Sequence, residues 1–247
     1  MKRFLLTAVF LISYAVSGNC VETIQSALFG KVLVYRPGGR PKHVVLFISG
    51  DGGWNKRTDE RARTMTTLDA LVVGIDAAFY MSHMKPTDQD CYNPAPDFLE
   101  LTKIVEKHMH VRTYIPPIVL GYSWGATFVY GMMIQTPPHT FAGAISMGFC
   151  PELPLSKPMC KGEGLEFEPY ETEKEKGFRL KPSSLLQEPW VIFQGEADAV
   201  CSAGGIEGFV NQVPHAQLVA LANVGHGFRV EKNWFPEFQK AFAVFEK

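Results

Sequence analysis

The 247-residue sequence has no marked excess of charge of either sign, because 24 Lys and Arg residues stand against 25 Asp and Glu residues. It contains no basic cluster, no internal repeat and no long low-complexity linker, which argues against a nucleic-acid-binding protein, a repeat array and a chain of several domains. Cysteine and histidine spacings typical of a zinc site are absent, as are G-x-G-x-x-G and the lysine pattern of a P-loop. We therefore expect neither a nucleic acid nor a nucleotide as ligand.

No apolar run reaches the roughly 20 residues that a membrane-spanning helix requires. The run over residues 4–16 is shorter, follows two cationic residues and precedes small residues, a pattern typical of a cleavable signal peptide over residues 1–17. The chain is therefore expected to be exported, with a mature part over residues 18–247. A short uncleaved anchor and a lipid-modified Cys20 are the alternatives.

The mature part, at about 230 residues, is long enough for a single α/β domain with a substantial core. Short apolar segments alternate with segments that favour helices. We predict strands over residues 31–35, 43–48, 71–76, 118–122, 141–149, 190–194 and 217–221, and helices over 55–68, 97–108, 124–136, 204–213 and 233–245. This alternation predicts a doubly wound, mostly parallel sheet with helices on both faces.

Charged residues concentrate in two segments. The first is the predicted helix over residues 55–68, whose solvated face is expected to carry Arg57, Asp59, Glu60 and Arg61. The second lies between residues 150 and 188, where the alternation stops and prolines and glycines precede a charged run over 166–176. We expect a cap or hairpin beside the pocket here, with a hairpin on the solvated surface as the alternative.

Five cysteines in an exported chain predict disulfide bonds. If Cys20 is left aside, Cys91, Cys150, Cys160 and Cys201 allow three pairings, and the sequence does not choose among them. Our hypothesis pairs Cys150 with Cys160 around a short proline-rich loop, and Cys91 with Cys201. A catalytic cysteine is disfavoured because none lies at a turn from a strand into a helix.

The most informative motif is G-x-S-x-G over residues 121–125, centred on Ser123. It follows an apolar β-branched run and precedes residues that can begin a helix, which is the strand-turn-helix setting of a nucleophile elbow. Glycine is needed at positions 121 and 125 because side chains there would collide with the neighbouring strand and helix. Since G-x-S-x-G also occurs by chance, the catalytic interpretation depends on finding partners for Ser123.

A serine hydroxyl becomes a nucleophile when a base takes its proton and a carboxylate orients that base. In α/β-hydrolases these groups follow in the order Ser, acid, His, each on a loop after a strand. Asp198 comes after the strand over 190–194, and His226 lies between two glycines after the strand over 217–221. We predict Asp198 as the acid and His226 as the base, with Glu196 as the alternative acid. The remaining histidines are expected to be ordinary surface or strand-edge residues: His43, His83, His108, His110, His139 and His215.

An oxyanion hole requires backbone N–H groups that point at the oxygen of the tetrahedral intermediate. The glycine-rich loop over residues 49–54 follows a predicted strand, where this fold places one donor, and the residue after the nucleophile supplies the other. We predict the amides of Trp124 and of Asp51 or Gly52, with a plain turn as the alternative for the loop.

Substrate contacts in open parallel sheets collect at the carboxyl ends of the strands. Asp76 and Tyr80 lie at such an end, and Trp54 closes the glycine-rich loop, so these three are candidate substrate-binding residues. A structural role is the alternative for Asp76 and Tyr80.

The loop Ser-Gly-Asp-Gly-Gly-Trp over 49–54, the elbow over 121–125 and Gly-Glu-Ala-Asp over 195–198 resemble the bacterial VirJ and AcvB virulence proteins. The resemblance covers nearly all of the mature chain and is closer to single-domain VirJ than to AcvB, which has an extra amino-terminal region. It implies a periplasmic α/β-hydrolase that cleaves the aminoacyl ester of lysyl- or alanyl-phosphatidylglycerol, associated in some members with type IV secretion. The triad positions of the family fall on Ser123, Asp198 and His226.

The expected reaction needs no metal and no organic cofactor. The expected partners are an aminoacylated phospholipid at the membrane surface and, in some members, type IV secretion components. An acidic pocket residue would help to bind a cationic lysyl group, and Asp51, Asp76 or Glu196 could supply it. Two alternatives stay open: a general exported carboxylesterase or thioesterase, and a periplasmic interaction protein that uses the hydrolase fold as a scaffold.

Overall fold

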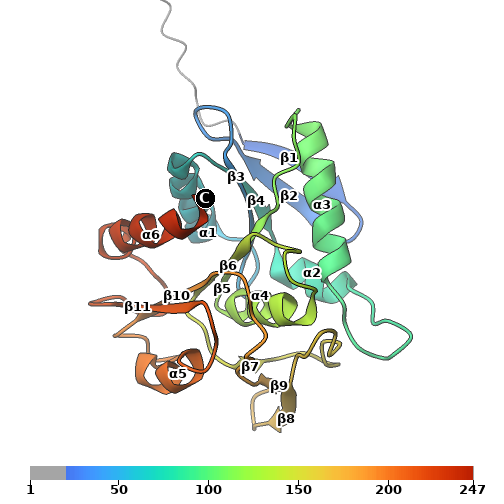
Figure 1. Ribbon diagram of the computed structural model, residues 1–247, viewed down its shortest axis with the longest axis vertical. Coiled ribbons are helices and arrows are strands. Elements are labelled where there is room, and N and C mark those ends of the chain that lie inside the picture. Colours follow the sequence, from blue (N-terminus) through green and yellow to red (C-terminus); the bar gives the residue numbers. More distant parts are fainter. Residues whose placement is uncertain (1–20, 247) are drawn as a thin grey trace, which may run out of the picture.

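A sheet of eight strands forms the centre of the computed structural model, which describes residues 21–246 (Figure 1). The strand order is β1-β2-β4-β3-β5-β6-β10-β11. Six neighbouring strands run parallel, namely β4, β3, β5, β6, β10 and β11. In contrast, β2 is antiparallel to β4, and β1 is antiparallel to β2. The bounds are Val21–Ser26 for β1, Gly30–Tyr35 for β2, His43–Ile48 for β3, Ala70–Ile75 for β4, Ile118–Tyr122 for β5, Gly143–Met147 for β6, Trp190–Gly195 for β10 and Ala216–Leu221 for β11. The predicted fold class is confirmed, and β1 is the one strand of this sheet that we did not predict.

Helices cover both faces of the sheet, because the central strands are apolar on both sides. One core packs α1 and α6 against the sheet, and the other packs α2, α3, α4 and α5 against the opposite face. The helices are α1 (Lys56–Met65), α2 (Ala77–His83), α3 (Ala95–His108), α4 (Trp124–Gln135), α5 (Ala203–Val210) and α6 (Phe235–Phe242), with short 3₁₀ turns at Thr66–Leu68, Glu231–Asn233 and Ala243–Phe245. This two-sided arrangement leaves the loops at the strand ends free to form a site.

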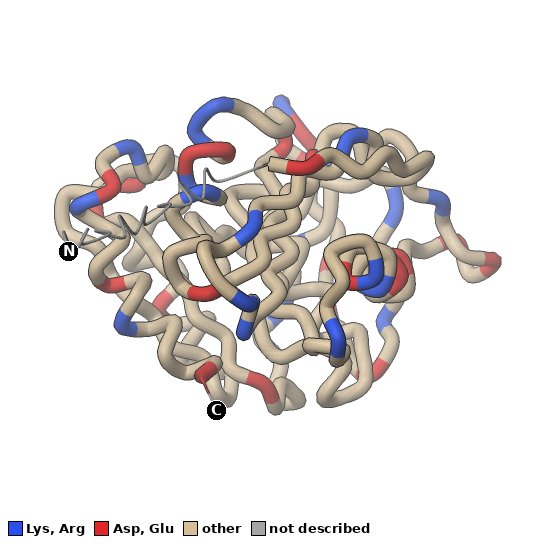
Figure 2. The backbone as a smooth tube through the Cα atoms, turned by 90° about the horizontal axis from the view of Figure 1, so that it is seen from above, with Lys and Arg blue, Asp and Glu red and all other residues tan. Residues whose placement is uncertain are grey.

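Lys, Arg, Asp and Glu residues lie around the periphery of the fold, whereas the strands that cross its middle are nearly free of them (Figure 2). Among residues 21–246, no helix combines the length and the apolar character needed to cross a membrane. The predicted signal peptide over residues 1–17 and Cys20 lie outside the described residues.

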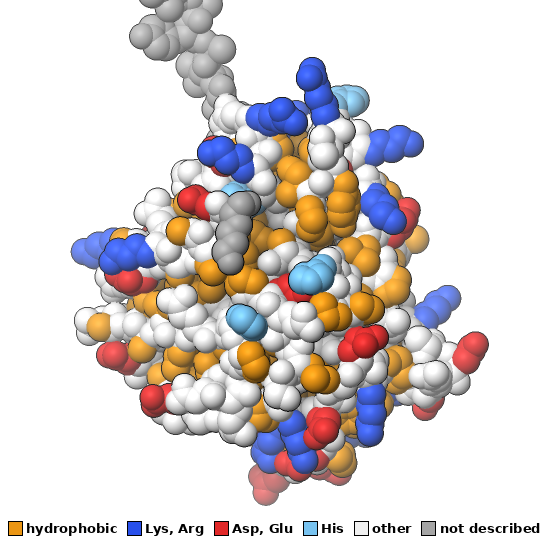
Figure 3. Space-filling model, in the orientation of Figure 1, with side chains coloured by type: hydrophobic (Ala, Val, Ile, Leu, Met, Phe, Trp, Pro, Cys, Tyr) orange, Lys and Arg blue, Asp and Glu red, His pale blue; other side chains and the backbone are white. Residues whose placement is uncertain are grey.

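The segment over residues 150–188 forms a second, three-stranded antiparallel sheet with the order β7-β9-β8. Its strands are β7 (Glu152–Leu153), β8 (Phe167–Glu171) and β9 (Lys176–Leu180). The β8–β9 hairpin carries side chains of both charges, which gather at one end of the molecule (Figure 3). Several of its side chains also line a cavity, described below.

The disulfide hypothesis is wrong: the bonds join Cys91 to Cys160 and Cys150 to Cys201. Cys150 and Cys201 follow β6 and β10, which are neighbouring parallel strands, so the two cysteines meet at one edge of the sheet. Cys91 and Cys160 are brought together because the amide of Cys160 donates to the carbonyl oxygen of Tyr92 at 2.8 Å. Two disulfides fit an exported protein.

Candidate active site

Ser123 occupies the sharp turn between β5 and α4, as the motif predicted. Its φ of 55° and ψ of −120° lie in a region that L-residues rarely adopt. The surrounding structure holds this strained backbone, since the Ser123 amide donates to the carbonyl oxygen of Met147 in β6 at 2.9 Å. The turn therefore presents the serine hydroxyl at the carboxyl edge of the sheet.

The two glycines of the motif permit the close packing of this turn. A Cβ atom at Gly121 would overlap the carbonyl group of Gly125. A Cβ atom at Gly125 would lie 2.6 Å from the carbonyl oxygens of Ile48 and Ser49, at the end of β3. Both positions thus require glycine because the elbow lies directly against its neighbouring strand.

His226 bridges the serine and an aspartate. Its Nε2 atom lies 2.9 Å from the Oγ atom of Ser123, and its Nδ1 atom lies 2.8 Å from the Oδ2 atom of Asp198. An ionised carboxylate only accepts hydrogen bonds, so Nδ1 carries the proton and Nε2 is left to accept from the serine hydroxyl. This tautomer is the one that allows Nε2 to act as a base.

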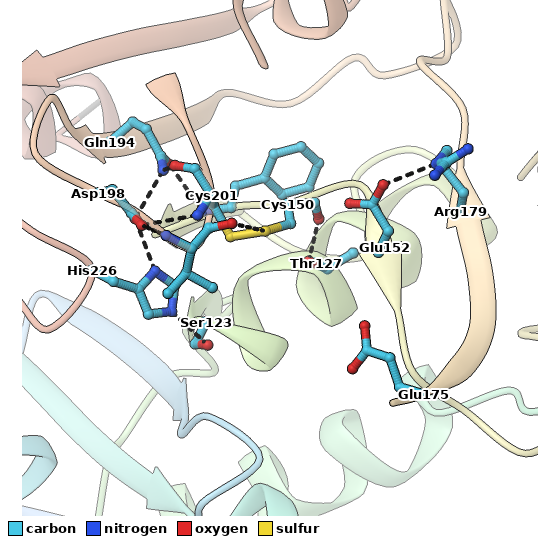
Figure 4. Close-up of a disulfide and its surroundings, with 12 residues drawn as sticks. Ser123, Thr127, Cys150, Glu152, Glu175, Arg179, Gln194, Asp198, Cys201 and His226 are labelled. Atoms are coloured by element: carbon cyan, nitrogen blue, oxygen red, sulfur yellow. Dashed lines mark hydrogen bonds and ion pairs between the residues drawn. A yellow bond between two sulfur atoms is a disulfide. The ribbon is translucent and has the colours of Figure 1, made fainter. Parts of the chain in front are cut away.

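The Asp198 carboxylate is fixed by several donors and is fully buried (Figure 4). Its Oδ1 atom accepts the amides of Val200 at 2.8 Å and Cys201 at 2.9 Å, and its Oδ2 atom accepts Nε2 of Gln194 at 3.1 Å. Glu196, the alternative acid, is exposed, and in the described part of the chain it accepts no hydrogen bond from His226. The geometry therefore favours Asp198.

Of the predicted oxyanion donors, Trp124 and Asp51 lie beside Ser123. Trp124 is the first residue of α4, so its N–H group has no partner within the helix. Asp51 lines the same cavity as Ser123, whereas the Gly52 amide donates to the Asp51 carboxylate at 3.0 Å. Because the Gly52 amide is already engaged, the geometry favours the Asp51 amide as the second donor.

The three predicted substrate contacts Trp54, Asp76 and Tyr80 are corrected, because the structure gives each a structural role. Tyr80 is only 1% exposed, and its hydroxyl donates to Asp97 at 3.0 Å. Asp76 caps α2 and accepts the Trp54 amide at 3.1 Å, while the Trp54 indole packs on Phe47. A position at the end of a strand can be predicted from the sequence, but the direction of the side chain cannot.

An acidic cavity of about 400 Å³ opens beside Ser123 and is lined by α4 and the β7–β9 sheet. It contains three carboxylates, from Asp51, Glu152 and Glu175, and one guanidinium, from Arg179. Arg179 donates to Glu152 at 2.9 Å, but in the described part of the chain neither Asp51 nor Glu175 has a cationic partner. The cavity therefore carries an excess of negative charge.

Glu152 and Glu175 were missed as site residues by the sequence analysis. Figure 4 places both on the side of Ser123 that faces away from His226. Tyr170 donates its hydroxyl to Glu175 at 3.1 Å, and burial together with this contact raises the pKa of Tyr170, so the phenol stays protonated. In the sequence, the charged run over residues 166–176 indicated the part of the cavity lining that holds Glu175, whereas Glu152 lies outside that run. Of the acidic candidates named from the sequence, Asp51 lines the cavity, while Asp76 and Glu196 do not.

The predicted position of Arg61 on a solvated helix face is wrong, because the residue is only 5% exposed. Its guanidinium carbon lies 4.4 Å from the ring centroid of Tyr122, and its Nη2 atom donates to the carbonyl oxygen of Gly227. Burial lowers the pKa of Arg61 below its ordinary value. The side chain thus joins α1 to the residue before Ser123 and to the residue after His226.

Residues 42–145 match a family described as "Bacterial virulence protein (VirJ)". The sequence resemblance is confirmed over this stretch, which holds Asp51 and Ser123, whereas Asp198 and His226 lie beyond it. The comparison with curated proteins gives no match.

Solved structures share the fold across nearly the whole chain. An α-β serine hydrolase homologue from Coxiella burnetii is 19% identical with a TM-score of 0.53, over 94% of this chain and 98% of that one. A dienelactone hydrolase from Anabaena variabilis is 14% identical with a TM-score of 0.58, over 92% and 97%. Carboxylesterase CesB from Bacillus subtilis is 13% identical with a TM-score of 0.55, over 92% and 91%. These similarities establish the α/β-hydrolase fold.

Proposed function

We propose that this protein, whose residues 42–145 match the VirJ family, is an exported serine hydrolase that cleaves the aminoacyl ester of aminoacylated phosphatidylglycerol. The observation that carries the proposal is the hydrogen-bonded chain from Ser123 through His226 to Asp198. A strained serine, a base in the right tautomer and a buried, oriented carboxylate together favour acyl transfer.

The reaction follows from the positions of these groups. Nε2 of His226 takes the proton of Ser123 while Oγ attacks the ester carbonyl carbon, and Asp198 stabilises the imidazolium that forms. The N–H groups of Trp124 and Asp51 bind the oxyanion of the tetrahedral intermediate, each worth about 3 kcal/mol of transition-state stabilisation. The imidazolium then protonates the departing alcohol. Water, activated by the same histidine, releases the amino acid from the serine.

The acidic cavity supports an aminoacyl group as the part that is transferred. The carbonyl carbon of an aminoacyl ester lies one bond from the carbon that bears an ammonium group, and a lysyl ester carries a second ammonium at its end. Asp51 and Glu175 could each neutralise such a charge beside Ser123, since neither is paired with a cation in the described residues. An uncharged acyl chain would gain nothing from these carboxylates.

The test of the proposed function uses the mature protein and liposomes that contain lysyl- or alanyl-phosphatidylglycerol. We expect release of the free amino acid together with formation of phosphatidylglycerol, measured by amine derivatisation and by mass spectrometry of the lipid. Rapid cleavage of a short soluble ester without release from either lipid would instead indicate a general esterase. Lack of cleavage of every ester would favour the interaction protein of a secretion apparatus.

Replacing Glu175 with Gln is expected to raise KM for a lysyl ester about fivefold, the upper range for a partly exposed ion pair. KM for an acetyl ester of the same alcohol should stay within twofold, because acetyl carries no charge. Glu173→Gln is the matched control, since Glu173 is exposed at the turn of the same hairpin and does not line the cavity. An equal rise of KM for both esters would show that Glu175 shapes the cavity rather than binds the cation.

A further inference from the structure

A second cavity, of about 410 Å³, opens at the amino-terminal end of α1. It is lined by Asn55, Lys56, Arg57, Arg61, Tyr122 and Gly227, so it contains three cationic side chains and no carboxylate. We call it the basic cavity. It shares no lining residue with the acidic cavity.

The cations of the basic cavity are poorly neutralised. Lys56 lies 3.9 Å from Glu60 across an exposed helix surface, which is a weak interaction. Within residues 21–246 neither Arg57 nor Arg61 forms a salt bridge, and the Nε and Nη1 atoms of Arg61 are buried without a hydrogen-bond partner. A buried guanidinium without a counter-ion is costly. An anion in the cavity would supply the missing counter-charge.

The fold places the basic cavity next to the reacting groups. Tyr122 precedes Ser123, and Gly227 follows His226. The Tyr122 ring lies 5.7 Å from the His226 ring by centroid, and the Arg61 guanidinium packs on the same Tyr122 ring. The acidic cavity belongs to the face of the sheet that α4 covers, whereas the basic cavity belongs to the face that α1 covers. Negative and positive cavities thus lie on the two sides of Ser123.

We propose that the basic cavity is an anion subsite that binds the phosphate of the leaving alcohol through Lys56, Arg57 and Arg61. The inference rests on the proposed function, because it assigns the group that departs from Ser123. In a phosphoglycerol ester, three carbon atoms separate the ester oxygen from the phosphate oxygen. The subsite thus assigns the two charges of one substrate to different cavities, its ammonium to the acidic cavity and its phosphate to the basic cavity.

The start of α1 strengthens this assignment. The first turn of a helix carries partial positive charge and N–H groups that lack helical partners. The Asn55 side chain accepts the amides of Arg57 and Thr58 at 3.0 and 3.2 Å, whereas the amide of Lys56 has no hydrogen-bond partner among the described residues. The side chains of Lys56 and Arg57 extend from this same turn, so backbone and side-chain donors can converge on one phosphate.

Soluble substrates test the subsite without the attraction of a basic surface to a charged membrane. We would compare the alanyl ester of glycerol 3-phosphate with the alanyl ester of glycerol, for the wild-type protein and for Lys56→Gln/Arg57→Gln. The wild-type kcat/KM should favour the phosphate-bearing ester, and the double variant should reduce this preference about tenfold or more. Lys103→Gln/Lys107→Gln on α3 removes the same charge from exposed positions and should keep the preference. Equal preference in all three proteins would overturn the proposal.

Binding of glycerol 3-phosphate to the Ser123→Ala protein, measured by calorimetry, separates the subsite from the reaction. Binding that is lost with Lys56→Gln/Arg57→Gln would support the subsite even if no ester were cleaved, in which case the proposed function alone fails. Cleavage of both esters at equal rates without glycerol phosphate binding would overturn the subsite and leave the hydrolase. Inorganic phosphate is the second probe: if it binds as tightly as glycerol 3-phosphate, the role in holding the leaving alcohol is refuted.

Discussion

Replacing Ser123 with Ala is expected to lower kcat/KM for ester hydrolysis by about 10⁴-fold or more, as when a serine hydrolase loses its nucleophile. The variant keeps the backbone turn and removes only the Oγ atom that His226 contacts. Asp198→Asn should have an effect of similar size, because an amide can donate to Nδ1 and hold His226 in the wrong tautomer. Rates of amino acid release under single-turnover conditions would measure both effects.

Glu196→Gln is the control for these two changes. Glu196 lies two residues before Asp198 on the same loop but is exposed, so its rate should stay within twofold of the wild type. Thermal unfolding of all three variants would show whether a loss of activity reflects a loss of folded protein. If Glu196→Gln were inactive and Asp198→Asn active, the assignment of the acid would be reversed. If Ser123→Ala kept full activity, the reaction would not pass through an acyl-serine.

The positions of Ser123, Asp198 and His226 could be predicted because each lies on a turn or loop that follows an apolar run, and each of these runs forms a strand of the main sheet. Parallel strands end at one edge of a sheet, so residues far apart in sequence meet there once the strand order is regular. The order Ser, Asp, His along the chain therefore carried most of the information. The distances that join the three side chains needed the structure.

Residues that depend on packing between distant segments could not be predicted in the same way. Arg61 was expected on a solvated face because its neighbours in α1 are charged, yet it is buried between the Tyr122 ring and the Gly227 carbonyl group. The Cys150–Cys201 pair follows from strand neighbours: β6 and β10 are adjacent in the sheet although β7, β8 and β9 lie between them in sequence. Neither relation leaves a periodic pattern in the chain.

In the proposed reaction, the opposite charges of the two cavities give these unpredicted residues a common role. Glu175 lies in the turn between β8 and β9, and Arg61 lies on α1, on the other side of the main sheet. Neither residue contacts the Ser123 hydroxyl, and the hydrolase fold requires neither. Substrate choice would therefore reside in elements outside the elbow and the triad loops, which agrees with the general separation of fold and specificity.

Opening the Cys150–Cys201 disulfide is expected to lower both stability and activity. Constraint of a loop of this size, with 51 residues of separation, stabilises a protein by about 4 kcal/mol in the chain-entropy description. Cys150→Ser/Cys201→Ser should therefore lower Tm by roughly 10 °C. Activity should fall as well, because the amide of Cys201 donates to the Asp198 carboxylate and its carbonyl oxygen accepts from Gln194.

Cys91→Ser/Cys160→Ser is the matched variant for that test, since its separation of 69 residues gives a similar entropic effect. Among the described residues neither Cys91 nor Cys160 forms a hydrogen bond with the Asp198 loop, so the variant should lose stability and keep its kcat well below Tm. The Cys150→Ser/Cys201→Ser variant should lose about tenfold in kcat at the same temperature, because a shift of about 1 Å in a supporting loop can cost far more than that. Equal kcat in both variants would mean that Gln194 and the Val200 amide hold Asp198 without help from the disulfide. A loss of kcat in the Cys150→Ser/Cys201→Ser variant alone would instead show that this disulfide helps to hold Asp198 and thereby to orient His226.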